Sequence, residues 1–242
     1  MSTVCLFSGG LDSAGCVAYA QRFLPKPTVP LYVHYGSVHE SAESTAAQML
    51  AERLGLQLQS ASIEYPNAVH SPLLRAHPDD NQRIKEGNLC IVPMRNALLL
   101  GLAASLAYSL GGSHIVYGAH LADSLGYPDC RAGFVNAMQD VLFWSLERIF
   151  TIEAPLLYPE RTVNTLEQYG FSTKRIRQLL TADVPEDVKG KTLSLLLLHE
   201  LGYEWVIPHT HSCYAGQQGG CGECATCRLR IKAEQLYEKL IA

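Results

Sequence analysis

The sequence predicts an α/β fold, in which helices flank a parallel sheet, followed by a small cysteine-rich appendage at the C-terminus. Short apolar runs alternate with longer segments of helical periodicity along most of the chain. This alternation is typical of right-handed βαβ crossovers and therefore of parallel strands. The 242 residues suffice for one large domain, and four of the eight cysteines lie within 213–227. We expect an α/β domain over 1–202 and a metal-binding segment over 203–242.

The first part of the chain predicts three strands and two helices. The strands are apolar or alternating runs, and the helices carry small apolar residues on one face. Gly55 is a typical helix stop. The expected elements are strands over 3–7, 29–35 and 56–63 and helices over 12–24 and 40–54. Between 64 and 93 the helix and strand patterns give way to prolines, histidines and charges, which indicates a long loop that is either functional or mobile.

The second part of the chain continues the alternation and contains one insert. The expected elements are helices over 94–110, 132–148, 191–201 and 225–241 and strands over 114–118 and 151–154. Residues 158–190 are polar, with Lys174, Arg175 and Arg177 bunched together, and predict one or two short inserted helices. Ligands bind at the carboxyl ends of parallel strands. We therefore expect the loops over 8–13, 34–39 and 119–131 to share one crevice.

Composition narrows the class of protein. A formal net charge of −4 argues against a nucleic-acid binder that relies on phosphate contacts. Apolar runs such as 97–108 are too short to span a membrane, and the first dozen residues do not form a signal peptide. Four cysteines are scattered at 5, 16, 90 and 130. This division between scattered and clustered cysteines favours reduced thiols in a cytoplasmic protein.

The turn between the first strand and the first helix reads SGGLDS. Its glycines allow close approach of a ligand, and the N-terminus of the following helix supplies free N–H groups, so the turn is a candidate phosphate cradle. It lacks the Gly-Lys-Ser/Thr ending of the Walker loop. Asp12 would repel phosphates unless a divalent cation such as Mg²⁺ lay between them. The plainer alternative is an ordinary turn in which Asp12 or Ser13 caps the helix.

Four cysteines form the second motif, with the spacing Cys-x7-Cys-x2-Cys-x2-Cys. Four thiolates at short spacing suit tetrahedral Zn²⁺, and a complete ligand set favours a structural site. An iron–sulfur centre is also compatible with four sulfur ligands. The sequence also allows free buried cysteines or a zinc knuckle that binds nucleic acid. The expected ligands are Cys213, Cys221, Cys224 and Cys227.

The first motif resembles the SGGxDS loop of the pyrophosphatase-loop ATPases, which cleave ATP between the α- and β-phosphates. A run in the 119–131 loop, G-Y-P-D-C-R, is similar to a stretch of the 7-cyano-7-deazaguanine synthases, the QueC family. Three further blocks agree with that family in order, so the resemblance covers nearly the whole chain. They are VPMRN at 92–96, APL at 154–156, and HSCY at 211–214 leading into CGECATCR at 221–228.

This resemblance implies roles for individual residues. The ATP phosphates would be held by Ser8, Gly9, Gly10, Asp12 and Ser13. The family places a lysine at the start of the helix before the cysteines, which corresponds to Lys191, and this lysine and Arg95 would neutralise the departing pyrophosphate. Asp129 would accept the paired N–H groups of a guanine-like edge, and Tyr127 would stack on it. Asp123 and Arg131 complete the substrate-binding set.

The implied reaction is ATP-dependent amidation of 7-carboxy-7-deazaguanine with ammonia and dehydration to the nitrile, by a homodimer with ATP, Mg²⁺ and Zn²⁺. Two departures stand near the expected crevice: Ser37-Val38 in place of the family's Gln-Arg/Lys, and the insert over 158–190. They leave open a relative of the antiviral-defence type, which transfers the acyl group to a protein amine. The motifs are also compatible with a tRNA thiolase that holds an iron–sulfur centre and with a non-catalytic zinc adaptor.

Overall fold

Five parallel strands form the centre of the protein, in the order β3-β2-β1-β4-β5. The structure is a computed structural model that describes residues 2–74, 91–217 and 219–242. In the register, Thr3 of β1 lies opposite Thr28 of β2 and His114 of β4. The strands are β1 (Thr3–Leu6), β2 (Thr28–His34), β3 (Gln59–Ser62), β4 (His114–Val116) and β5 (Thr151–Glu153). The predicted parallel sheet is confirmed, although β3 is shorter than the expected 56–63.

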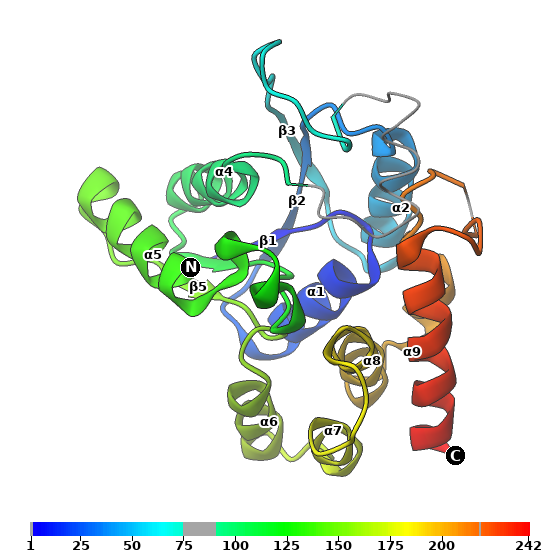
Figure 1. Cartoon of the computed structure of the whole chain (residues 1–242). Coiled ribbons are helices and arrows are strands. Elements are labelled where there is room, and N and C mark those ends of the chain that lie inside the picture. Colours follow the sequence, from blue (N-terminus) through cyan, green and yellow to red (C-terminus); the bar gives the residue numbers. More distant parts are fainter. Residues whose placement is uncertain (1, 75–90, 218) are drawn as a thin grey trace.

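Helices cover both faces of the sheet (Figure 1). On one face, the apolar sides of α4 (Arg95–Ser109) and α5 (Ala132–Leu146) pack on the strands. The other face carries α1 (Leu11–Phe23) and α2 (Glu40–Arg53), and a further layer of helices packs outside them. That layer contains α6 (Pro159–Gln168), α7 (Lys174–Leu180), α8 (Glu186–Glu200) and α9 (Ala225–Ile241). Among the described residues, no helix is long and apolar enough to cross a membrane.

The central helix of the outer layer is α8, which lies among α1, α7 and α9 (Figure 1). Four consecutive leucines, Leu195 to Leu198, are 0% exposed. A helix that is apolar on all sides is buried on all sides, and each buried leucine contributes roughly 1.5–3 kcal/mol. The C-terminal helix α9 joins the same core through the buried Ala233.

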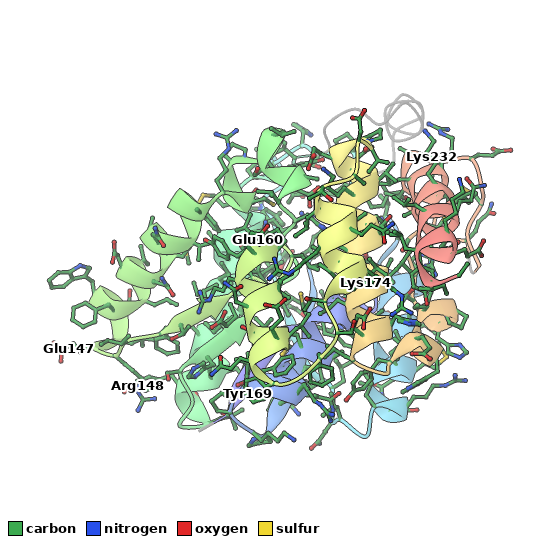
Figure 2. The ribbon with its side chains drawn as sticks, turned by 90° about the horizontal axis from the view of Figure 1, so that it is seen from below. Glu147, Arg148, Glu160, Tyr169, Lys174 and Lys232 are labelled. Carbon is green, nitrogen blue, oxygen red and sulfur yellow. The ribbon has the colours of Figure 1, made fainter. Side chains whose placement is uncertain are left out.

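The insert forms two helices, α6 and α7, as predicted. Figure 2 views them from below, with Glu160 and Tyr169 marking α6 and Lys174 marking the start of α7. Four of their apolar residues are fully buried in the core around α1: Val163, Leu166, Ile176 and Leu179. Two of the bunched basic residues are paired: the Arg175 and Arg177 guanidinium groups lie 3.1 and 2.9 Å from the carboxylates of Glu200 and Glu167. The insert is therefore a packed layer of the fold.

Three helix starts differ from the expectation, and α1 begins at Leu11, one residue earlier than predicted. α4 begins at Arg95, one residue later than predicted, and α8 begins at Glu186 instead of Lys191. Pro185 precedes α8, and Glu186 and Asp187 place negative charge in its first turn, where it complements the helix dipole. Lys191 thus lies in the second turn of α8. Residues 75–90 of the predicted 64–93 loop, with Cys90, lie outside the described residues.

Candidate active site

The phosphate loop closes tightly between β1 and α1. Gly9 has a φ of +73°, and a Cβ there would lie 2.4 Å from the Ala47 backbone nitrogen of α2, so glycine is required. The Ser13 hydroxyl donates to the Gly10 carbonyl at 3.0 Å, and the Gly10 N–H donates to the Ser8 hydroxyl at 3.3 Å. The N-cap of α1 is Gly10, without a side-chain cap. The alternative that Asp12 or Ser13 caps the helix is therefore wrong, and the first N–H groups of α1 have no side-chain partner at the cap.

Asp12, in the first turn of α1, is held from three sides. Its Oδ2 lies 2.6 Å from Lys191 Nζ, and its Oδ1 lies 2.9 Å from His120 Nε2. The Ser194 hydroxyl also donates to Oδ1, at 2.9 Å. Burial disfavours the charged carboxylate, but His120 and Lys191 outweigh it and hold the pKa of Asp12 well below its usual range. Asp12 is a carboxylate at neutral pH and ties α1 to α8.

A cavity of about 280 Å³ opens at the carboxyl ends of β1, β2 and β4. Its walls come from the phosphate loop, the loop after β2 and the loop after β4, which confirms that these three loops share one crevice. Seven of the predicted catalytic, phosphate-binding and substrate-binding residues line it: Ser8, Gly10, Asp12, Ser13, Arg95, Asp123 and Lys191. No described residue of the 158–190 insert lines the cavity, and neither do Ser37 and Val38. Ser37 and Val38 lie between Tyr35 and His39, which do line the cavity, and the insert ends at Gly190, next to the lining residue Lys191.

Arg95 lies in an aromatic part of the cavity. Its guanidinium is over the Tyr35 ring, 5.9 Å from the ring centroid, and Tyr214 and Asp129 are close enough to act on its charge. Burial disfavours the guanidinium charge, but these neighbours outweigh it, and the pKa of Arg95 is raised above its usual value. The two predicted cations therefore have different surroundings, since Lys191 pairs with Asp12 of the phosphate loop.

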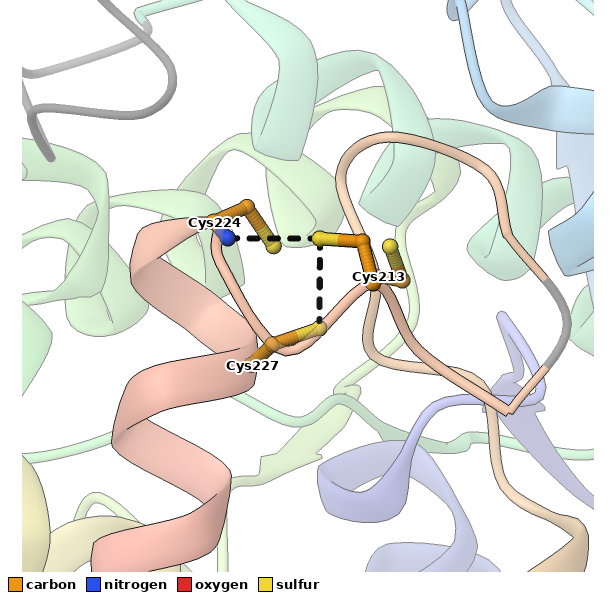
Figure 3. Close-up of side chains that lie close together, drawn as sticks. Cys213, Cys224 and Cys227 are labelled. Atoms are coloured by element: carbon orange, nitrogen blue, oxygen red, sulfur yellow. Dashed lines mark hydrogen bonds between the residues drawn. The ribbon is translucent and has the colours of Figure 1, made fainter.

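The four clustered cysteines meet at the start of α9. Their sulfur atoms lie within 4.8 Å of one another, and Figure 3 shows Cys213, Cys224 and Cys227 converging. The Cys221 and Cys227 sulfurs are 3.9 Å apart, close to the ~3.8 Å between two ligands of a tetrahedral zinc–thiolate site. Burial opposes ionisation of Cys224, but donors that include the Thr226 hydroxyl lower its pKa to about 6. The cluster fits a tetrahedral metal with four sulfur ligands.

The cysteine segment also holds the phosphate loop. The His211 N–H donates to the Gly9 carbonyl at 2.9 Å, and both His211 and Cys213 line the cavity. His211 Nε2 lies 2.9 Å from the Cys213 carbonyl, so this histidine supports the segment from within. The segment that carries the four cysteines is part of the cavity wall.

Comparison with known proteins identifies the family. A family model described as the queuosine biosynthesis protein QueC matches residues 2–177 and 161–238. The chain belongs to the QueC family. Membership places it among ATP-using enzymes of queuosine biosynthesis and agrees with the resemblance drawn from its motifs.

Two solved structures are similar to this QueC-family chain. The U34-tRNA thiolase NcsA from Methanococcus maripaludis, with its [4Fe-4S] cluster, is 13% identical, with a TM-score of 0.41 over 98% of this chain and 81% of that one. The NH3-dependent NAD synthetase from Campylobacter jejuni, in complex with the nitrate ion, is 18% identical, with a TM-score of 0.34 over 84% of this chain and 85% of that one. Both scores are too low to argue a shared ligand or reaction.

The QueC-type G-Y-P-D-C-R stretch contributes only Cys130 to the described lining of the cavity. Of the four predicted substrate residues, Asp123 lines it, while Tyr127, Asp129 and Arg131 are absent from the described lining. Asp129 acts on the charge of Arg95. Arg131 is exposed and donates from Nε to the Ser124 carbonyl at 2.8 Å. In this structure the stretch supports Arg95 and the loop after β4.

Sequence reasoning missed several residues of this QueC-family site. His39 is 4% exposed, stacks on Tyr214 at 5.3 Å and 23°, and lies 3.3 Å from Glu43 through Nε2. Tyr35, His39 and Tyr214 belong to family-type blocks, and that membership was the available signal. Ser194 had no such signal, because only the packing of α8 against α1 brings it to Asp12. His120 belongs to the loop after β4, which was expected at the crevice, but no motif singled it out.

Proposed function

We propose that this QueC-family enzyme converts 7-carboxy-7-deazaguanine, ATP and ammonia to 7-cyano-7-deazaguanine, with release of AMP and pyrophosphate. The observation that carries the proposal is the cavity in which the phosphate loop meets residues of the QueC-type blocks. Asp12 and Ser13 come from the loop, Arg95 from the VPMRN block and Asp123 from the loop after β4. One cavity thus combines a phosphate cradle with groups suited to a polar heterocycle.

The phosphate end of the cavity is assigned to ATP. Ser8, Gly9, Gly10 and Ser13 bind the phosphates through the loop and the N-terminus of α1. Lys191 stabilises the pyrophosphate as it leaves the α-phosphorus. Mg²⁺ enters with ATP and offsets repulsion between the phosphates and Asp12. The 2.6 Å contact between Lys191 and Asp12 keeps this lysine at the loop.

The other end is assigned to the deazaguanine. Asp123 accepts N–H groups of the guanine-like edge, and Arg95 attracts the substrate carboxylate and supplies charge for the pyrophosphate. Tyr35, beneath Arg95, provides an aromatic surface on which a flat ring can stack. Asp129 acts indirectly, because its negative charge stabilises the positive charge of Arg95. Tyr127, in the same stretch, is assigned a supporting role.

The chemistry needs no covalent enzyme intermediate. The substrate carboxylate attacks the α-phosphorus of ATP, which gives an acyl-adenylate and pyrophosphate. Ammonia displaces AMP to form the amide, and adenylation of the amide oxygen by a second ATP allows loss of AMP and a proton to give the nitrile. Positioning and charge stabilisation carry these steps.

Ammonia is the proposed nitrogen donor, and the four cysteines are assigned to structural Zn²⁺. Transfer to a protein amine was suggested by the basic insert, but the insert is packed in the core with Arg175 and Arg177 paired. A homodimer and a cytoplasmic location remain part of the proposal.

Pyrophosphate exchange tests the proposal. Labelled pyrophosphate should enter ATP when 7-carboxy-7-deazaguanine is present and should not enter without it. With ammonium added, mass spectrometry should detect free 7-cyano-7-deazaguanine. Pyrophosphate exchange at the same rate with and without the deazaguanine would contradict the proposed substrate. A reaction that stops at the acyl-adenylate or the amide until a protein is supplied would favour transfer to a protein amine.

A further inference from the structure

His120 contacts the site without lining the cavity. Its side chain is buried at 4% exposed, and its Nε2 lies 2.9 Å from Asp12 Oδ1. Its other ring nitrogen, Nδ1, is also buried and has no hydrogen-bond partner among the described residues. A carboxylate oxygen only accepts hydrogen bonds, so the ring nitrogen that faces it must carry an N–H. We therefore assign an N–H to Nε2, which donates it to Asp12.

The backbone of α8 fixes the ring of His120 in place. A Cβ added at Gly190 would lie 2.9 Å from His120 Nδ1 and 3.4 Å from Ala122 Cβ. The imidazole is thus held between Gly190 on one side and Asp12 on the other. Ser194, one turn after Gly190, donates to the same oxygen of Asp12.

These contacts leave the Asp12 carboxylate with one partner that can move. Lys191 has a long side chain and lines the cavity, so its ammonium group can transfer from Asp12 to phosphates that arrive beside it. Once Lys191 has moved, the negative charge of Asp12 stands beside other negative charges. His120 and Ser194 are then the protein donors that still hold it.

We propose that His120 is a positioning residue that fixes Asp12 through Nε2–H, so that Lys191 can be released to the phosphates of ATP. The inference rests on the proposed function only in taking ATP as the ligand of the phosphate loop. Without the His120 donor, Asp12 retains Lys191 more strongly or swings towards the phosphates and repels them. Both effects weaken binding of Mg·ATP and slow adenylation.

Four variants separate this role from simple packing. His120→Leu removes the donor, and His120→Gln restores an amide N–H near the position of Nε2. Gly190→Ala keeps His120 but places a methyl group against Nδ1, on the side of the ring opposite Asp12. Gly101→Ala in α4 is the matched control, because it adds the same methyl group to a helix where nothing lies within 4 Å.

The readouts are the dissociation constant of Mg·ATP by calorimetry, the rate of pyrophosphate exchange, and the melting temperature. Loss of one charge-assisted hydrogen bond predicts about a ten- to hundredfold weaker affinity for His120→Leu. His120→Gln should recover most of the loss. Gly190→Ala should weaken binding because it displaces the ring, with only a small change in melting temperature, since the helix propensity of alanine offsets part of the cost of the added methyl group. Gly101→Ala should match the wild type in binding and exchange.

Wild-type affinity in His120→Leu overturns the inference, and so does a His120→Gln variant that is no better than His120→Leu. A wild-type chain that binds Mg·ATP with the expected pattern among the variants, but shows no exchange with the deazaguanine, refutes the proposed function and leaves the role of His120 standing. A wild-type chain that does not bind Mg·ATP overturns both.

Discussion

Gly9 is the residue whose identity the loop geometry dictates most strongly. Its φ of +73° disfavours any side chain, and α2 leaves no room for a Cβ. Gly55, at the end of α2, has a φ of +68° but nothing within 4 Å of an added Cβ. A substitution at Gly55 would therefore introduce backbone strain alone, whereas one at Gly9 would introduce both strain and a steric clash.

Gly9→Ala should lower the free energy of unfolding by about 2–5 kcal/mol, because it combines left-handed strain with a clash against backbone. Gly55→Ala should cost only the strain, about 1–2 kcal/mol. Urea denaturation of both variants checks the difference. Equal losses would mean that α2 yields to the added methyl group.

Asp12 makes stability depend on pH in a defined direction. Because its folded pKa lies below the unfolded value of about 3.9, its contribution is complete above that value and declines as the pH falls. Asp12→Asn should cost about 3 kcal/mol between pH 5 and 7, since Lys191 and His120 lose a buried charged partner. The difference from the wild type should shrink below about pH 4. Chemical denaturation across this range provides the measurement, and a difference that grows on acidification would contradict it.

At the level of elements, the packing of α6 and α7 shows what the insert contributes to the fold. The insert and its basic residues left open transfer to a protein amine, whereas its apolar residues pack in the core around α1. Leu166 is 0% exposed, while Arg177 forms an exposed pair with Glu167. The contribution of the insert to stability and to activity can therefore be tested with one variant of a buried residue and one variant of an exposed residue.

Leu166→Ala should reduce the free energy of unfolding by about 2–5 kcal/mol, as expected for a cavity in a packed core. Arg177→Ala should cost less than about 1 kcal/mol, because exposed ion pairs contribute little. Thermal denaturation and pyrophosphate exchange of both variants are the measurements, and Arg177→Ala should keep wild-type exchange. A large loss of exchange in Arg177→Ala would restore the insert to the active site.

At the scale of the whole molecule, the cysteine cluster connects a candidate metal site to the cavity. The segment that supplies Cys213 also lines the cavity and binds the phosphate loop through the His211 N–H. A structural metal stabilises only the folded arrangement of its ligands. Loss of the metal should therefore loosen the wall of the cavity as well as the cluster.

Cys224→Ser should lower both metal content and pyrophosphate exchange, and a strong chelator should do the same to the wild type. Elemental analysis should find about one zinc per wild-type chain, since four thiolates complete one tetrahedral site. Cys16, which lies outside the cluster and is fully buried in the core, provides a control, because Cys16→Ala should leave the metal content unchanged. Iron with sulfide absorption in the wild type would contradict zinc and favour a thiolase.

The local patterns of the sequence determined the parallel sheet, the SGGLDS loop, the cysteine ligands and the meeting of three loops in one crevice. These features follow from short-range rules: apolar periodicity, glycine at a tight turn, and the common edge at which parallel strands end. Only the tertiary structure decided that His120 and Ser194 hold Asp12 and that the helices α6 and α7 of the insert pack in the core around α1. Asp12 is separated from Ser194 by 182 positions. Contacts of that kind depend on how α8 docks on α1, and no local pattern encodes the docking of two helices.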